Sequence, residues 1–416
     1  MFLLHDDHRW RTQNNDSESV RLWPKFAARK HTSKIAKYLQ LLINIHYIMT
    51  YSWRTAFLLL SLFFSIRASA FDFSKNKFPA GDSLKFYDGQ SFPIIGKSHK
   101  EKNYIRFAEK YNGVVRKPVW DLGHDAAGIS IRFRSNATNI VIRWTLRGDA
   151  NLPHMPATGV KGVDLYGYVS DHWQFVNTGI PDGKSSESTL LNRGDGVSRE
   201  YLLNLPLYEG VDSVFIGVNA NAEISSPKEK YLLEKKPVVY YGSSIAQGGV
   251  ATRPGMAFTN ILSRKLNRSF INLGFSGNGT FDSSVGQAMS EVDAALYVID
   301  CNPNTPDSLV YGGALHLVQL LKSLRPEIPI LLVEGFDYDT DAFRKEKNAS
   351  VEKKRAGLKK AFEELQRLGV KQLYYRKGND LIGSDHEGTV DGVHPNDIGM
   401  MRIADALMPV IRSIAQ

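Results

Sequence analysis

Five short apolar runs, separated by segments with helical spacing, fill the C-terminal part of this 416-residue chain. Continuous apolar runs of four to six residues are typical of parallel strands that are buried on both faces of a sheet. The alternation of strand and helix predicts a doubly wound sheet with helices on both faces. The runs are Val238–Tyr241, Phe270–Leu273, Ala295–Ile299, Ile328–Val333 and Gln372–Tyr375.

Helical spacing is clearest in four segments between and after these runs. In a doubly wound sheet, ligands bind beyond the carboxyl ends of the strands. Residues that directly follow each apolar run are therefore the first place to look for chemistry. The helical segments are Ala257–Leu266, Leu315–Leu324, Val351–Leu368 and Asp397–Leu407.

Residues 71–232 have a different pattern, in which short strands follow one another without helices between them. Residues 128–134 alternate apolar and polar side chains with period two. The runs Gly162–Val169 and Trp173–Val176 flank Ser170-Asp171-His172, as the strands of a hairpin would. Many short strands in series predict an all-β sandwich, jelly-roll-like, in front of the α/β domain that spans residues 233–416.

The beginning of the chain predicts export. Met49 opens a segment with Arg54, the apolar run Ala56–Phe64 and the small residues Ala68-Ser69-Ala70. These are the three parts of a signal peptide at 49–70, and its apolar run is short for a membrane span. We therefore interpret residues 1–48 as an over-extended start of the gene model and expect a secreted or periplasmic protein. A retained membrane anchor is the alternative.

The net charge of +9 does not indicate a nucleic-acid partner. Residues 1–70 hold ten Lys and Arg against four Asp and Glu, which leaves only +3 for the rest of the chain. This near balance gives no electrostatic footprint for a polyanion.

Cys301 is the only cysteine, so no disulfide can form within the chain. Oligomeric state is left open by the sequence.

Three polar or glycine-rich segments directly follow the first three apolar runs. Ser244 follows the first run in a strand-to-helix turn, where a hydroxyl is presented near the amides of a helix start. Gly277 lies in a glycine-rich segment after the second run, and Asn302 follows the third. Backbone and side-chain amides there could donate to developing negative charge. Each segment alone is also ordinary turn or cap composition.

A histidine near the C-terminus supplies the base that a serine nucleophile requires. His394 stands in Asp391-Gly392-Val393-His394-Pro395, just ahead of the last helical segment. An imidazole accepts and returns a proton near neutral pH, and a carboxylate three residues away can orient its other nitrogen. A loop histidine with an unrelated aspartate is the alternative for this motif on its own.

The order of the four motifs resembles the SGNH, or GDSL-type, hydrolases over roughly residues 236–416. The resemblance implies a flavodoxin-like three-layer α/β/α domain. It assigns the nucleophile to Ser244, the general base to His394 and the orienting carboxylate to Asp391. Its oxyanion donors are the amides of Ser244 and Gly277 and the side chain of Asn302.

Three residues depart from the family pattern. Ser243 replaces the Asp of Gly-Asp-Ser, and Asp300 and Pro303 replace the Gly and second Asp of Gly-x-Asn-Asp. None of these changes removes a catalytic group. The preceding β-domain resembles a two-domain subfamily of bacterial exported proteins, some of which are carbohydrate acetyl esterases.

We therefore expect a carboxylic ester hydrolase that acts on small acyl esters, acetyl foremost, of a small molecule or polysaccharide. The alternatives are a lysophospholipase-like lipid esterase and an inactive carbohydrate-binding protein. Tyr166, Tyr168 and Trp173 are candidates for sugar stacking, with strand core as the favoured alternative. No cofactor or metal is expected, because the cluster Asp385-His386-Glu387 lacks an established ligand spacing.

Overall fold

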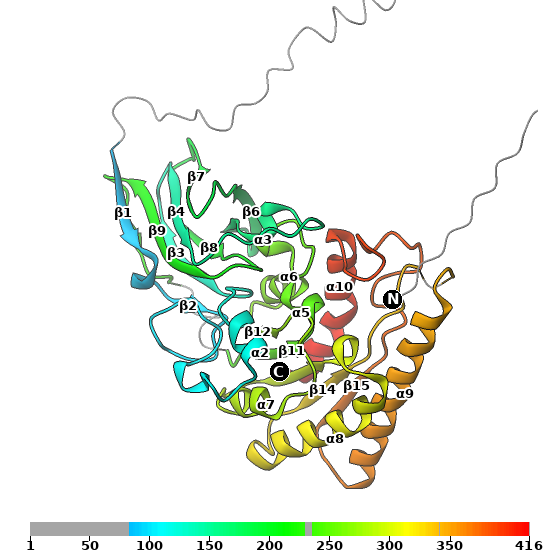
Figure 1. The fold of residues 1–416 in the computed structure, drawn as a ribbon. Helices are drawn as coiled ribbons and strands as arrows, with labels where there is room; N and C mark the ends of the chain where they lie inside the picture. The colour runs from blue at the N-terminus through cyan, green and yellow to red at the C-terminus, as the bar shows by residue number, and fades with distance from the viewer. Residues whose placement is uncertain (1–82, 229–234, 341, 416) are drawn as a thin grey trace, which may run out of the picture. The chain divides into compact units, whose positions relative to one another are not determined.

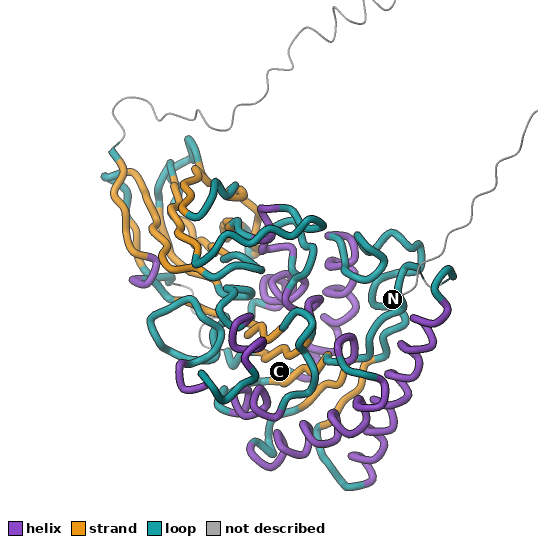
Figure 2. Tube along the Cα trace, in the orientation of Figure 1, coloured by secondary structure: helices purple, strands orange, loops and turns teal. Residues whose placement is uncertain are grey.

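The computed structural model describes residues 83–228, 235–340 and 342–415, all within one compact unit, Lys77–Gln416. The predicted signal peptide at 49–70 and the residues before it lie outside these ranges. The first part of the unit is built from strands, and the last part from strands wrapped by helices (Figures 1 and 2). None of the helices in the described ranges has the length and apolarity to cross a membrane.

The α/β part is built on one parallel sheet, as predicted (Figure 1). Its strand order, β12-β11-β13-β14-β15, places the first strand of the sequence between the second and the third. Gly242 at the end of β11 is paired with both Gly274 and Asp300, so three neighbouring strands end at one level. The strands are β11 (Val238–Gly242), β12 (Phe270–Gly274), β13 (Leu296–Asp300), β14 (Ile330–Val333) and β15 (Leu373–Arg376).

Helices cover both faces of this sheet, because alternate strand residues point to opposite sides and nearly all of them are apolar. On one face, Val238 and Tyr240 pack in a cluster with residues of α5, α6 and α10. On the other, Val239 and Tyr241 pack with α7, α8 and α9. The helices are α5 (Ser244–Gln247), α6 (Phe258–Leu266), α7 (Ser283–Ser290), α8 (Asp307–Leu324), α9 (Lys345–Arg367) and α10 (Asp397–Ile414).

Helices α8, α9 and α10 are longer than the segments predicted for them, and α7 is an additional helix. The segment predicted at Leu315–Leu324 is the second half of α8, which begins at Asp307. Its first turns contain Gly312 and Gly313, and glycine weakens a helical signal in the sequence. Helix α7 was not predicted, because serine and glycine make up half of its eight residues.

The first part is an antiparallel β-sandwich, as predicted. One sheet has the order β1-β9-β4-β7, and the other β10-β3-β8-β5-β6 with β2 beside β3. Apolar side chains from both sheets, such as Phe133, Trp144 and Ile216, form its core. The strands are β1 (Leu84–Asp88), β2 (Ile94–Ile95), β3 (Ser130–Ser135), β4 (Ile140–Leu146), β5 (Val163–Val169), β6 (His172–Gly179), β7 (Ser185–Leu191), β8 (Arg199–Asn204), β9 (Val211–Asn219) and β10 (Ile224–Ser225).

Two short helices, α2 (Lys117–Leu122) and α3 (Ala157–Val160), interrupt the strands of this part.

A buried carboxylate joins the β-sandwich part to the α/β part. Asp164 on β5 is fully buried and accepts hydrogen bonds from the guanidinium of Arg253 at 2.7 Å and the amide of Gly255 at 2.8 Å. Because buried charges need partners, these hydrogen bonds help to hold the two parts together.

Candidate active site

Ser244 is the first residue of α5, directly beyond β11. The preceding residue, Ser243, caps the helix, and its hydroxyl accepts from the amide of Ile245 at 3.3 Å. This cap explains why Ser243 is acceptable where the Gly-Asp-Ser pattern has Asp, since both are good N-cap residues. The Ser244 side chain lies at the carboxyl edge of the sheet, where the sequence predicted the site.

His394 and Asp391 come from the loop before α10 and reach the same place. The His394 Nε2 lies 3.0 Å from the Ser244 Oγ, and its Nδ1 lies 2.7 Å from Asp391 Oδ2. The other carboxylate oxygen, Oδ1, accepts from the amides of His394 at 2.7 Å and Val393 at 2.9 Å. One aspartate thus fixes both the imidazole and the loop that carries it.

These hydrogen bonds keep the Asp391 carboxylate ionised. Partial burial alone would raise its pKa, but the hydrogen bonds from the His394 amide and ring and from the Val393 amide bring the pKa down to about 2. The carboxylate is therefore ionised at neutral pH and favours a proton on His394 Nδ1. Nε2 is then free to accept the hydroxyl proton of Ser244.

Gly277 and Asn302 lie in the loops that follow the two strands beside β11. Gly277 has a φ of +68°, in the left-handed region, which glycine adopts without steric cost. Asn302 is 2% exposed, and neither its amide nitrogen nor its oxygen has a hydrogen-bond partner within the described residues. A buried amide of this kind is suited to donate to a ligand.

Asp300, which departs from the family pattern, has a structural partner. Its carboxyl group accepts from the hydroxyl of Tyr240 at 3.0 Å, and burial raises the pKa of Asp300 to about 7 against that hydrogen bond. It belongs to the core beneath the site. The next departing residue, Pro303, lies at the site, and its carbonyl accepts from Lys354 Nζ at 3.1 Å.

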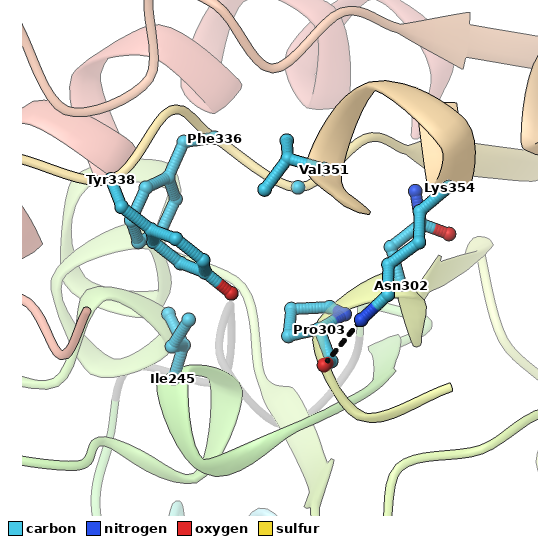
Figure 3. Close-up of a pocket in the computed structure, with 8 residues that line it drawn as sticks. Ile245, Asn302, Pro303, Phe336, Tyr338, Val351 and Lys354 are labelled. Carbon is cyan, nitrogen blue, oxygen red and sulfur yellow. Dashed lines mark hydrogen bonds between the residues drawn. The ribbon is translucent and has the colours of Figure 1, made fainter. Parts of the chain in front are cut away.

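A small, mainly apolar pocket adjoins Asn302 (Figure 3). Figure 3 shows the rings of Phe336 and Tyr338 on one side of the space and Val351 and Lys354 on another. Ile245, the residue after Ser244 in the sequence, also lines the pocket. The full lining is Ile245, Asn302, Pro303, Gly335, Phe336, Tyr338, Val351 and Lys354.

Two neighbours of the serine and histidine were missed by the sequence reasoning. The exposed His154, between β4 and α3, has its ring centroid 5.8 Å from that of His394. Tyr208, after β8, donates its hydroxyl to the backbone carbonyl of Ser244 at 3.2 Å. Both come from the β-sandwich part, and no motif in the sequence marks them.

One cluster among the described residues could hold a metal ion, and it overlaps the serine-histidine site. His154, Asp391 and His394 each place a ligand atom within 4.8 Å of the others. Two of these three residues, His394 and Asp391, already share the 2.7 Å hydrogen bond described above. Asp385 of the cluster considered in the sequence instead forms two 2.7 Å hydrogen bonds with Arg402.

The aromatic residues considered for sugar stacking are mostly buried. Tyr166 is 4% exposed and packs against the guanidinium groups of Arg253 and Arg264. Trp173 is 9% exposed, and Tyr168 is partly buried against it. The burial of Tyr166 and Trp173 therefore agrees with strand core, which the sequence favoured over sugar stacking, because these side chains fill the space around the strands and the adjoining helix.

Comparison with known proteins gives a family match for each part. A model of the GDSL-like lipase/acylhydrolase family matches residues 235–412. A model of the N-terminus of SGNH hydrolase-type esterases matches residues 84–224. A comparison with functionally curated proteins finds no match.

Solved structures share the whole architecture. A Bacteroides ovatus protein described as a GDSL-like lipase is 33% identical, with 80% of this chain and 98% of that chain covered and a TM-score of 0.76. Salicylyl-acyltransferase SsfX3 of a tetracycline biosynthetic pathway is 15% identical, with 81% and 98% covered and a TM-score of 0.63. A family two carbohydrate esterase from Cellvibrio japonicus is 12% identical, with 80% and 98% covered and a TM-score of 0.51. The last two likenesses show the fold alone.

Proposed function

Because this chain belongs to the GDSL-like lipase/acylhydrolase family and is an ester hydrolase, we propose that it is a serine esterase that removes small acyl groups, acetyl foremost, from carbohydrates. One observation carries the serine esterase part of the proposal. A continuous hydrogen-bonded chain runs from Ser244 through His394 to Asp391, at 3.0 and 2.7 Å.

In the first step, Ser244 Oγ attacks the ester carbonyl carbon while its proton passes to His394 Nε2. The negative charge that forms on the carbonyl oxygen is stabilised by the amides of Ser244 and Gly277 and by Asn302 Nδ2. His394 then gives the proton to the leaving alcohol oxygen as its bond to carbon breaks. Asp391 stabilises the His394 imidazolium throughout this step and keeps a proton on His394 Nδ1.

In the second step, water attacks the acyl-serine. His394 removes a proton from the water and returns it to Ser244 Oγ as the acid departs. The overall reaction consumes one ester and one water and yields one acid and one alcohol. It requires only the side chains and amides already described.

The acyl preference is supported by the pocket that Asn302 and Ile245 line. Its lining of Ile245, Phe336 and Tyr338 suits a short apolar acyl group. The carbohydrate part of the proposal rests on the predicted export signal at 49–70 and on the likeness in fold to the family two carbohydrate esterase. A location outside the cytoplasmic membrane, secreted or periplasmic, is part of the same proposal.

Ester hydrolysis by the purified protein tests the proposal. Rates are measured with p-nitrophenyl acetate, p-nitrophenyl octanoate and an acetylated oligosaccharide, each beside Ser244→Ala. We expect turnover of the acetate and the acetylated oligosaccharide, and a loss of about 10⁶ in kcat in Ser244→Ala. Preference for octanoate would indicate a lipid esterase instead. Saccharide binding without serine-dependent turnover would indicate a binding protein.

A further inference from the structure

Three side chains from the part of the chain before residue 225 contact the segments that carry the serine and the oxyanion donors. The buried guanidinium of Arg106 donates to the backbone carbonyl of Gly274, at the end of β12. Tyr208 donates to the carbonyl of Ser244 at 3.2 Å. Asp125, between α2 and β3, accepts from Gln247 Nε2 at 2.8 Å. The β-sandwich part therefore touches the site through several bonds.

The contact between Asp125 and Gln247 leads to the loop that carries Gly277. Gln247 is the last residue of α5 and is fully buried. Its Nε2 donates to Asp125 and, at 3.1 Å, to the carbonyl of Leu207. These two acceptors fix the amide orientation, so that Oε1 faces the amide of Ser276 and accepts from it at 2.9 Å. Ser276 directly precedes Gly277.

We propose that Asp125 is a positioning residue, which acts through Gln247 to hold the loop after β12 so that the Gly277 amide faces the oxyanion. The inference deepens the serine esterase function proposed above and rests on it. It gives the β-sandwich part a role in the strength of the oxyanion hole.

The expected size of the effect follows from the geometry. Without an acceptor at residue 125, Gln247 Nε2 keeps only the carbonyl of Leu207, and the amide that holds Ser276 loses part of its restraint. A displacement of about 1 Å at a donor can cost as much as ~10²-fold in rate. Since Ser276 and Gly277 stay tethered to β12, we expect a loss of roughly tenfold in kcat.

The test compares Asp125→Leu with Asp125→Asn in the full-length protein. Asn keeps an oxygen that accepts from Gln247, whereas Leu fills similar space without one. We measure kcat and KM for p-nitrophenyl acetate and the inhibition constant of phenylboronic acid, which forms a tetrahedral adduct with a serine oxygen. For Asp125→Leu we expect kcat about tenfold lower, KM unchanged and boronate inhibition weakened about equally. Asp125→Asn is expected within threefold of wild type.

Asp164→Asn is the matched control. Asp164 is also a carboxylate of the β-sandwich part that bonds to the α/β part, but its partners are Arg253 and Gly255. We expect its Tm to fall and the kcat of its folded protein to stay within twofold. This separates general loosening of the two parts from an effect on the oxyanion loop.

Wild-type kcat in folded Asp125→Leu, or equal losses in the Leu and Asn variants, would overturn the inference. If Asp125→Leu does not fold, Gln247→Met tests the same link from its other end, with the same expected loss and the same overturning result. Absence of Ser244-dependent turnover in the wild type would instead refute the serine esterase function. The two failures are therefore distinguishable.

Discussion

At the scale of single residues, Asn302 combines burial with missing partners. A buried amide without hydrogen bonds costs roughly 1–3 kcal/mol, and both polar atoms of this side chain are unpaired within the described residues. The neighbouring pocket is lined by apolar groups such as Ile245 and Phe336. A leucine at position 302 would therefore suit the folded structure while it removes the donor.

We expect Asn302→Leu to keep or raise the free energy of unfolding and to lower kcat by about 10²–10³. Asn272→Leu is the control, because Asn272 is buried with its amide fully bonded to Ala246, Thr259 and Gly274 at 2.6 to 3.0 Å. That variant should lose roughly 2–4 kcal/mol of stability. Denaturant unfolding and ester turnover are measured on both. Equal destabilisation in the two variants would contradict the missing partners of Asn302, and a wild-type kcat in Asn302→Leu would contradict its donor role.

At the scale of elements, two glycines in the loop between β12 and α7 have different reasons to be glycine. Gly277 adopts the left-handed region, yet a Cβ there would meet nothing within 4 Å. At Gly279 a Cβ would lie 2.1 Å from the carbonyl oxygen of Gly242 on β11. Gly277 is glycine because of its backbone conformation. Gly279 is glycine because the loop approaches the strand before Ser244 too closely for a side chain.

Gly279→Ala should therefore push the loop away from β11 and lower kcat by ~10²-fold. Gly277→Ala should cost about 1–2 kcal/mol of stability through its positive φ, with kcat within tenfold because its amide is retained. Turnover and thermal unfolding of both variants provide the measurement. A larger loss of kcat in Gly277→Ala than in Gly279→Ala would show that the close approach to Gly242 is unimportant.

The sequence predicted those elements whose signal is local. Apolar runs revealed the parallel strands, and the common edge of such strands led to Ser244 and Asn302. Helix α7 was missed because serine and glycine make up half of its eight residues and give only a weak helical signal. Asp125, His154 and Tyr208 were missed because they meet the site only through the packing of the β-sandwich part against the α/β part. Residue spacing carries no information on such contacts.

At the scale of the whole molecule, stability should depend on pH through carboxyl groups of opposite behaviour. Burial raises the pKa of Asp300 and of Asp125 to about 7, the latter despite the nearby Arg106 and Gln247 and with a further increase from Glu209. In the unfolded chain an aspartate titrates near ~3.9. Between pH ~4 and ~7 these two carboxyl groups therefore bind more protons in the folded protein than in the unfolded chain, and the stability that they contribute falls as the pH rises through this window.

Asp391 and Asp385 act in the other direction. Hydrogen bonds bring the pKa of each to about 2, so their stabilisation is present above pH ~4 and is lost as the pH falls toward 2. We therefore expect the contribution of these four carboxyl groups to the Tm to be highest near pH ~4–5 and to decline toward pH 8. Asp300→Asn keeps an acceptor for the Tyr240 hydroxyl but cannot titrate, so its Tm should decline less between pH 5 and 8. Asp385→Asn, the control, should keep the wild-type slope in that range, because Asp385 is ionised throughout it. Thermal unfolding at pH 5, 6.5 and 8 measures the three slopes, and an unchanged slope in Asp300→Asn would mean that Asp300 carries its charge in the folded protein.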